Sequence, residues 1–317
     1  MVFTKIDLGL DAGNAYMKTS EDVRFASVVE EGERKLDTPS TAYEVEINGT
    51  TWLVGDEREG GVRFITMDKC DEEEYKVLVL TAIALSCESD KVEVNLVTGI
   101  PVDFLNSHAA KYRDALMSIG EKEVKIKGSD FMKTVIIRIA DAKVVDQGSI
   151  NLTDEEVEYP SMCVDFGGGT FDVSLWSLDE NGTPQRDATY TAYDLGFDNV
   201  LQDYNLLLKE RHEITTEWHK CRQYIDRDTL LVDGKDVNIK AYRDEILSRY
   251  VKKIHTRIKS RGMNYRLVRK INVIGGCAQT VLPYLEKEMK KATFNLVEEP
   301  QFANARSFKQ IAVKVNG

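Results

Sequence analysis

The stretch Cys163–Ser174, CVDFGGGTFDVS, decides how the rest of this 317-residue sequence is interpreted. Its pattern predicts a strand over 162–166, a turn at three consecutive glycines, and a second strand over 170–174. Glycine has no Cβ, so such a turn can adopt positive φ angles and point successive backbone N–H groups at one spot, which suits a phosphate. The alternative is a plain β-hairpin with a glycine turn.

Carboxylates flank this turn, with Asp165 before it and Asp172 after it. A carboxylate repels a neighbouring phosphate unless a divalent cation lies between them, so the arrangement predicts Mg²⁺ held through water. A second hairpin of the same kind would favour phosphate binding over the plain hairpin.

Such a second hairpin is predicted near the N-terminus, in KIDLGLDAGNAYMKTS (residues 5–20). Asp11-Ala12-Gly13 repeats the order Asp-x-Gly, and Lys18 on the returning strand is placed to neutralise a β- or γ-phosphate. Asp7-Leu8-Gly9 shows the same order one step earlier, but only the later aspartate is followed by Gly-Asn and a lysine at this distance. The sequence contains no GxxxxGK[ST], so this is not a P-loop.

A third glycine-rich junction follows a short predicted strand, Lys270–Ile274. Gly275 and Gly276 separate that strand from a helix predicted over Ala278–Lys291. Bare backbone at a strand–helix junction lets a flat ligand lie against it, although a tight turn has the same pattern.

Strands and helices alternate along the chain, which favours an α/β fold with a mixed sheet. Helices are predicted at 71–85, 107–119 and 241–261 and from about 198 and 303, strands at 92–102 and 135–145, and a hairpin at Asn48-Gly49. Gln147 follows the strand at 135–145, on the segment that links the two phosphate-binding halves. A polar side chain there could orient an attacking water, and a plain loop residue is the alternative.

Composition excludes several classes of protein. The formal charge of −11 argues against nucleic acid as the primary ligand, since phosphate contacts need clustered lysine and arginine. The five cysteines are scattered and form no CxxC. The sequence also has no apolar run of membrane-spanning length and no secretory pattern at the N-terminus. These features predict a reduced, cytoplasmic protein.

One basic run, Arg249–Lys270, has no acidic residue. It is interpreted either as a solvated helix face or as a docking surface for an acidic patch of another copy.

The three glycine-rich stretches resemble, in their order and spacing, the motifs of the actin-like ATPases that are called phosphate 1, phosphate 2 and adenosine. These stretches are DAGNAYMK, DFGGGTFD and VIGGCAQTVLP. The resemblance covers the whole length of the chain. Three further stretches resemble the bacterial plasmid-segregation actins of the ParM and StbA type. They are TGIPVDF, IRIADAKVVDQG and PQFANARSF. DFGGGTFDVS is also close to the seventy-kilodalton heat-shock chaperones, but the chain lacks their peptide-binding domain.

The resemblance implies an α/β, actin-like (ribonuclease H-like) fold of two domains with the nucleotide in the cleft between them. Domain I would comprise 1–158 and 299–317, and domain II 159–298. The cofactors implied are ATP or GTP and Mg²⁺, with Asp11 and Asp165 ordering the metal through water and Gln147 positioning the lytic water. Nucleotide contacts are expected from Gly13, Asn14, Lys18, Gly167, Gly168, Gly169, Thr170, Gly275, Gly276 and Cys277.

The resemblance also implies an ATPase that polymerises head to tail into dynamic filaments and segregates plasmid DNA. Its partners would be further copies of the chain and a DNA-bound adaptor protein of the ParR type, without direct contact to nucleic acid or membrane. The alternative is a non-polymerising ATPase of the same fold, either a chaperone-like module or a small-molecule kinase.

Overall fold

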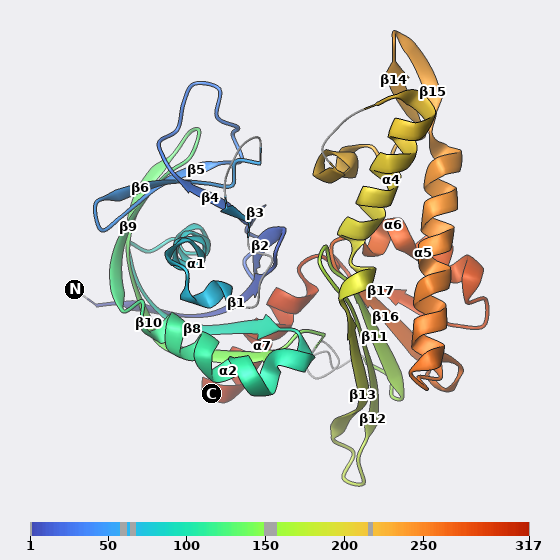
Figure 1. Ribbon diagram of the computed structural model, residues 1–317. Coiled ribbons are helices and arrows are strands. Elements are labelled where there is room, and N and C mark those ends of the chain that lie inside the picture. The colour runs from blue at the N-terminus through green and yellow to red at the C-terminus, as the bar shows by residue number, and fades with distance from the viewer. Residues whose placement is uncertain (1, 58–61, 64–67, 149–156, 215–217, 317) are drawn as a thin grey trace. The chain divides into compact units, whose positions relative to one another are not determined.

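The computed structural model describes residues 2–57, 62–63, 68–148, 157–214 and 218–316, which form two compact units (Figure 1). Unit 1 comprises Met1–Glu155 and Phe302–Gly317, and unit 2 comprises Glu156–Gln301. In the described part of the chain, no helix is both long and apolar enough to cross a bilayer.

Unit 1 is built on a ten-stranded mixed sheet. In spatial order its strands are β3 (Arg24–Ala26), β2 (Tyr16–Thr19), β1 (Thr4–Ala12), β8 (Lys91–Ile100), β10 (Met132–Asp146), β9 (Glu121–Lys127), β5 (Tyr43–Ile47), β6 (Thr50–Val54), β4 (Val28–Glu31) and β7 (Val62–Arg63). The central strands β1, β8 and β10 run parallel, and antiparallel strands extend the sheet on both sides. The carboxyl ends of the three parallel strands therefore meet at one edge.

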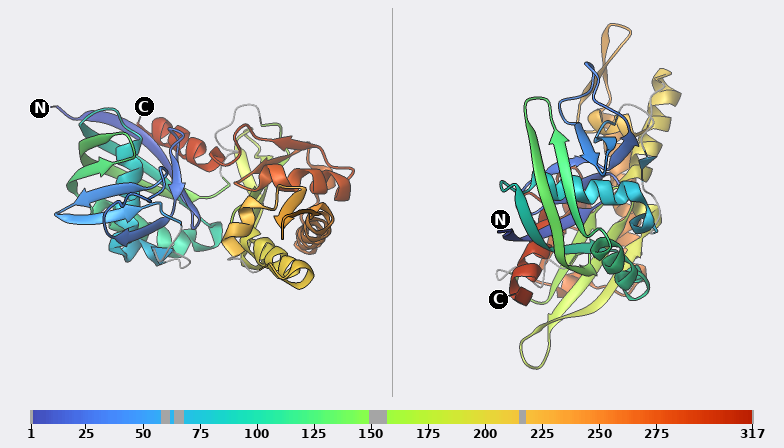
Figure 2. Two further views of the ribbon diagram at one scale, coloured as in Figure 1. Left: turned by 90° about the horizontal axis from the view of Figure 1, so that it is seen from above. Right: turned by 90° about the vertical axis from the view of Figure 1, so that its left-hand side faces the viewer.

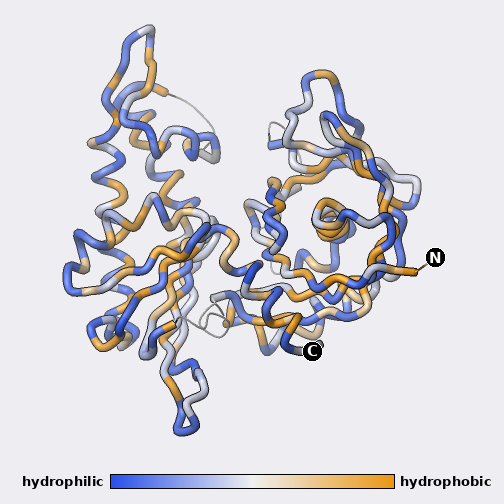
Figure 3. The backbone as a smooth tube through the Cα atoms, turned by 180° about the vertical axis from the view of Figure 1, so that it is seen from behind, coloured by the Kyte–Doolittle hydropathy of each residue, from blue (hydrophilic) through white to orange (hydrophobic). Residues whose placement is uncertain are grey.

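Among the described residues, three α-helices complete unit 1. The sheet curves around α1 (Glu73–Leu85), whose buried side chains lie on every side of the helix, so Figure 3 shows a largely hydrophobic tube there. Helices α2 (Val102–Met117) and α7 (Ala303–Asn316) lie outside the curve of the sheet, and α7 runs along β1 (Figure 2). A short 3-10 helix, η1 (Lys69–Asp71), precedes α1.

Two glycines allow α7 to approach the sheet. A Cβ on Gly9 would lie 1.8 Å from the carbonyl oxygen of Ala305, and one on Gly99 would lie 2.2 Å from the ring of Phe308. Gly9 therefore lies inside β1 and lets α7 pack closely on that strand. The Asp-x-Gly repeat at residues 7–9 is part of the strand and forms no turn. This assigns the first hairpin turn to the later repeat, which ends at Gly13.

Unit 2 contains a five-stranded sheet in the order β13 (Pro184–Ala192), β12 (Phe171–Leu178), β11 (Ser161–Phe166), β16 (Lys270–Ile274) and β17 (Phe294–Leu296). Its helices α4 (Phe197–His212), α5 (Lys240–Ser260) and α6 (Ala278–Glu288) share an apolar core with this sheet. Between α4 and α5 lie a separate hairpin, β14 (Thr229–Val232) and β15 (Lys235–Asn238), and the 3-10 helix η3 (Trp218–Gln223). The 3-10 helices η2 (Tyr193–Leu195) and η4 (Tyr265–Leu267) precede α4 and β16.

The predicted mixed α/β organisation is confirmed, and so is the hairpin at Asn48-Gly49, where both φ angles are positive (54° and 82°). The helix predicted to begin at residue 107 was placed wrongly, because α2 begins directly after Pro101, which ends the preceding segment. The helix predicted to reach residue 291 ends at Glu288. Strands β9 and β13 and the hairpin β14–β15 were not predicted.

Candidate functional site

The first predicted phosphate hairpin joins β1 to β2. Asp11 at the end of β1 lies opposite Lys18 in the strand register. The Lys18 ammonium donates a 2.7 Å hydrogen bond to the Asp11 carboxylate, and the side chains are only 14% and 6% exposed. The lysine expected to neutralise phosphate is thus held beside the carboxylate expected to order the metal.

The second hairpin joins β11 to β12. Asp165 on β11 is buried and pairs with Asp172 on β12. Asp172 accepts hydrogen bonds from the hydroxyls of Thr170 and Thr191 at 2.8 and 2.5 Å. These bonds tie Asp172 into its own sheet, so of the two carboxylates Asp165 is the candidate for metal chemistry.

The two turns share one local geometry. A Cβ on Gly13 would lie 2.9 Å from the carbonyl oxygen of Tyr16, and a Cβ on Gly167 would lie 2.9 Å from that of Thr170. In each case the glycine comes two residues after a buried aspartate and three before the residue that it approaches. The two hairpins are therefore equivalent in structure as well as in sequence order.

The carbonyl groups of the second turn are held by the start of α4. The backbone N–H groups of Phe197 and Asp198 donate to the carbonyl oxygens of Gly167 and Gly168 at 3.0 and 2.9 Å. The C=O and N–H groups of a trans peptide point in opposite directions, so the N–H groups of Gly168 and Gly169 face away from these donors. Successive amides turned to one side are the arrangement that binds an anion.

The third glycine-rich junction lies against the second hairpin, because β16 pairs with β11 in parallel. Gly275 has a φ of +96°, and a Cβ there would lie 2.4 Å from Oδ1 of Asp165 and 2.6 Å from the carbonyl oxygen of Phe166. Only glycine fits at this position, for reasons of both conformation and space. A Cβ on Gly276 would meet no atom within 4 Å, so its backbone has open space beside it.

Arg222 in η3 is a side chain of this junction that the sequence did not reveal. Its guanidinium donates to the Gly276 carbonyl oxygen at 2.6 Å and to the Cys277 sulfur at 2.7 Å, and it lies 5.1 Å from the centre of the Phe197 ring. Cys277 itself is buried. An arginine more than fifty residues earlier in the chain therefore hydrogen-bonds the junction that is expected to face the base.

Gln147 lies at the same sheet edge of unit 1 as Asp11. It directly follows β10, and its backbone N–H donates to the carbonyl of Ile100 at the end of β8 at 3.0 Å. Because β8 lies between β1 and β10, the two candidate residues are two strands apart, or about 10 Å by the usual strand spacing. Unit 1 thus brings Gln147, Asp11 and Lys18 to one edge.

The donor groups of the described residues limit how a metal could be held. Among the described residues, no three carboxylate, imidazole or thiol side chains converge on one point. Mg²⁺ usually keeps several waters and takes one or two carboxylates together with phosphate oxygens. Each unit offers one buried aspartate at its own hairpin, and a single carboxylate fits a metal that is held through water and phosphate rather than by a protein cage.

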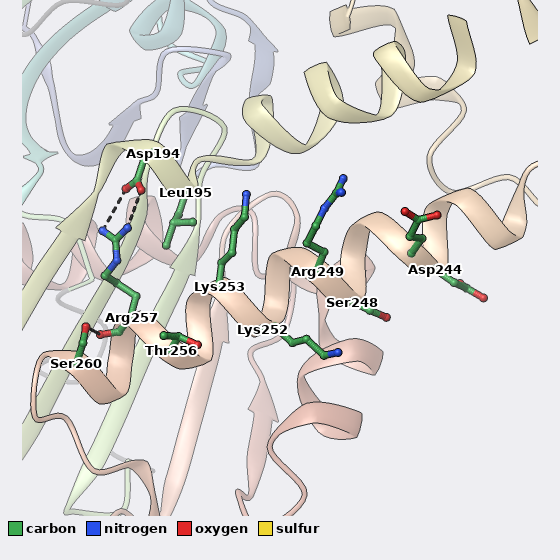
Figure 4. A pocket seen from close by; sticks show the side chains of 11 residues that line it. Asp194, Leu195, Asp244, Ser248, Arg249, Lys252, Lys253, Thr256, Arg257 and Ser260 are labelled. Carbon is green, nitrogen blue, oxygen red and sulfur yellow. Dashed lines mark hydrogen bonds and ion pairs between the residues drawn. The ribbon is translucent and has the colours of Figure 1, made fainter. Parts of the chain in front are cut away.

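The basic run on α5 borders an open groove of ≈ 860 Å³ in unit 2 (Figure 4). Arg257 pairs with Asp194 at 2.7 Å, and this hydrogen-bonded contact lowers the pKa of the Asp194 carboxyl. Arg249 lies 3.8 Å from Asp203, whereas the neighbouring Lys252 is exposed. Ion pairs within unit 2 therefore explain part of this run and favour the solvated helix face over a docking surface.

A second unpredicted residue, Lys69 in η1, reaches the first hairpin from 55 residues away and bonds Asn14. Its local sequence, MDKCDEEE, is that of a solvated segment, so no signal near it indicated this contact.

Comparisons with known proteins agree with this geometry. Residues 9–149 match the family described as the N-terminal domain of actin-like proteins, and residues 163–287 match the C-terminal domain of the archaeal, MreB-like actin homologues. No curated protein matches the sequence.

Among solved structures, the chain is similar to a ParM filament from Clostridium botulinum at 17% identity, with 98% of this chain and all of the other covered and a TM-score of 0.80. It is similar to an archaeal actin homologue in complex with ADP at 17% identity, 98% and 99% coverage and a TM-score of 0.77. For Bacillus thuringiensis ParM with ADP the identity is 16%, the coverage 98% and 99%, and the TM-score 0.72. The α/β, two-domain actin-like fold expected from the motifs is thereby confirmed.

Proposed function

We propose that the chain, of which residues 9–149 and 163–287 match two domain families of actin-like proteins, binds and hydrolyses ATP and polymerises into dynamic filaments that segregate plasmid DNA. The observation that supports nucleotide binding best is the pair of equivalent hairpins, each with a buried aspartate two residues before a glycine that no larger residue could replace without strain. Solved relatives of this fold are described with ADP and as filaments.

In this proposal each residue has one role. Asp11 and Asp165 accept hydrogen bonds from metal-bound water, and Lys18 exchanges its carboxylate partner for a phosphate. When bound, Mg²⁺ would neutralise charge on the phosphate oxygens. Gln147 orients the attacking water. The remaining contacts come from the first turn (Gly13 and Asn14), the second turn (Gly167, Gly168, Gly169 and Thr170) and the base-facing junction (Gly275, Gly276 and Cys277).

The partners follow from self-assembly and from charge. Head-to-tail contacts between identical copies generate an open filament. A chain with a net charge of −11 is poorly suited to bind DNA directly, so we propose that an adaptor of the ParR type connects the filament to plasmid DNA in the cytoplasm. The base, adenine or guanine, is set by contacts in unit 2 that the hairpins do not determine.

Assembly is tested by light scattering and negative-stain microscopy of the purified protein with Mg²⁺ and ATP, with GTP in a parallel sample. Filaments that form with nucleotide and shorten as phosphate is released support the proposal. Phosphate release without filaments at any protein concentration would instead support the non-polymerising ATPase.

Replacing Gln147 by alanine should slow hydrolysis about tenfold to a hundredfold while leaving nucleotide affinity and filament formation intact, because the side chain acts only on the attacking water. Filaments of the variant should persist longer than those of the wild type. Phosphate release and light scattering, followed in the same sample, measure both quantities. Loss of assembly together with normal hydrolysis would contradict the assigned role.

A further inference from the structure

Lys69 is a buried lysine in direct contact with the first hairpin. Its side chain is only 7% exposed, and its ammonium donates to the carbonyl oxygen of Ala12 at 2.6 Å and to Oδ1 of Asn14 at 3.2 Å. The ammonium also lies 5.8 Å from the centre of the Tyr75 ring. No other part of the proposed mechanism uses this residue.

Burial of an ammonium group is unfavourable, which makes its position informative. Desolvation lowers the pKa of Lys69 to about 8, although the nearby Asp11 carboxylate opposes this shift. The charged and titratable groups around it are Asp11 on β1, Cys70 in η1 and Tyr75 on α1. Its two hydrogen-bond acceptors are neutral and both belong to the turn, so the burial of this lysine is tied to the shape of that turn.

A second side chain holds the next carbonyl of the same turn. The Ser27 hydroxyl donates to the carbonyl oxygen of Gly13 at 2.7 Å. Two successive carbonyls, those of Ala12 and Gly13, are thus held by side chains from elsewhere in unit 1. Because C=O and N–H point in opposite directions across a trans peptide, the N–H groups of Gly13 and Asn14 face away from Lys69 and Ser27.

The second hairpin reaches the same result by other means. There, the backbone N–H groups at the start of α4 hold the carbonyls of Gly167 and Gly168. In the first hairpin two side chains hold two carbonyls instead, and these lie one position earlier relative to the aspartate, at Ala12 and Gly13. In both turns, therefore, two consecutive carbonyl groups accept hydrogen bonds on the side opposite to the N–H groups of the turn.

We propose that Lys69 is a positioning residue for phosphate binding, which fixes the Ala12 carbonyl and the Asn14 side chain so that the first turn presents its N–H groups to a phosphate. The inference rests on the proposed nucleotide-binding function and extends it to a residue outside the glycine-rich motifs. Ser27 assists at the next carbonyl.

The test replaces Lys69 by methionine, which is unbranched, one heavy atom shorter than lysine and without its donors. Affinities for ATP, ADP and adenosine are measured by calorimetry, or with the guanine series if the wild type binds that base. We expect ATP and ADP affinity to fall about tenfold or more and adenosine affinity to stay unchanged, since adenosine has no phosphate. An equal loss for all three ligands would show a general structural defect and overturn the proposal.

A matched control is Lys76→Met, which alters a lysine on α1 whose ammonium pairs with Glu73. This control should bind all three ligands as the wild type does. In Lys69→Ala, ethylammonium added to the solution should restore part of the ATP affinity by occupying the vacated position. Restoration in Lys69→Ala but not in Lys69→Met, whose side chain still fills the position, supports positioning by the ammonium, and the absence of restoration in Lys69→Ala overturns it.

Failure of the inference is distinguishable from failure of the proposed function. If the wild type binds no nucleotide, the proposed function itself is wrong. If the wild type binds ATP and Lys69→Met binds it equally well, only the role of Lys69 is wrong.

Discussion

We expect Asp165→Ala to reduce the proposed nucleotide hydrolysis by about a hundredfold, close to background, while the protein stays folded. The reason is that Asp165 is buried where the turn begins, whereas Asp172 accepts hydrogen bonds from the hydroxyls of Thr170 and Thr191. Without the carboxylate, the water shell of a bound Mg²⁺ would lose a hydrogen-bond acceptor, and the cation that neutralises the phosphate would be held less firmly. Phosphate release at saturating ATP and Mg²⁺ measures the effect.

The control for this substitution is Asp187→Ala, which removes an exposed carboxylate from β13 in the same sheet. It should hydrolyse ATP at the wild-type rate. Near-ultraviolet circular dichroism of both variants checks that the aromatic core of unit 2 is intact. Wild-type turnover by Asp165→Ala, in a protein with an unchanged spectrum, would remove Asp165 from the mechanism.

We expect Gly9→Ala to destabilise unit 1 by about 3 kcal/mol or more, although no role in nucleotide binding is proposed for residue 9. Its Cβ would lie 1.8 Å from the carbonyl oxygen of Ala305 and 2.6 Å from the backbone nitrogen of Lys309. Both atoms belong to the backbone of α7, so no side chain can rotate to relieve the clash and the helix itself has to move. The midpoint of urea-induced unfolding, followed by far-ultraviolet circular dichroism, measures the loss.

Gly32→Ala provides the matched control, because a Cβ there would meet no atom within 4 Å and its φ is not in the left-handed region. This variant should unfold within about 0.5 kcal/mol of the wild type. Equal midpoints for the two variants would mean that α7 does not pack on β1 as closely as described.

The parts of the site that could be predicted are those whose chemistry is local in sequence. Asp11 and Gly13, like Asp165 and Gly167, lie two residues apart, and a turn of this type depends on the residues within it. The competing Asp-x-Gly repeat at residues 7–9 could not be rejected from the sequence. Only the structure shows that Gly9 faces the backbone of another element.

The parts that could not be predicted depend on contacts between distant segments. Lys69 and Arg222 reach their partners from more than fifty residues away, and each lies in a segment whose composition suggests exposure to solvent. The same limit applied to β9 and β13. Their alternation of exposed and buried residues shows which strands they pair with only once the sheets are assembled.

The hydrogen bonds between the second turn and the first residues of α4 couple the orientation of this helix to the position of the turn. Its 16 residues span about 24 Å, from the glycines at one end to the segment leading to β14 and β15 at the other. A rotation of α4 by about 5° around its first turn displaces the far end by about 2 Å. Because the helix is hydrogen-bonded directly to the turn, a small movement of Gly167 and Gly168 would displace the far end of α4 by a larger distance.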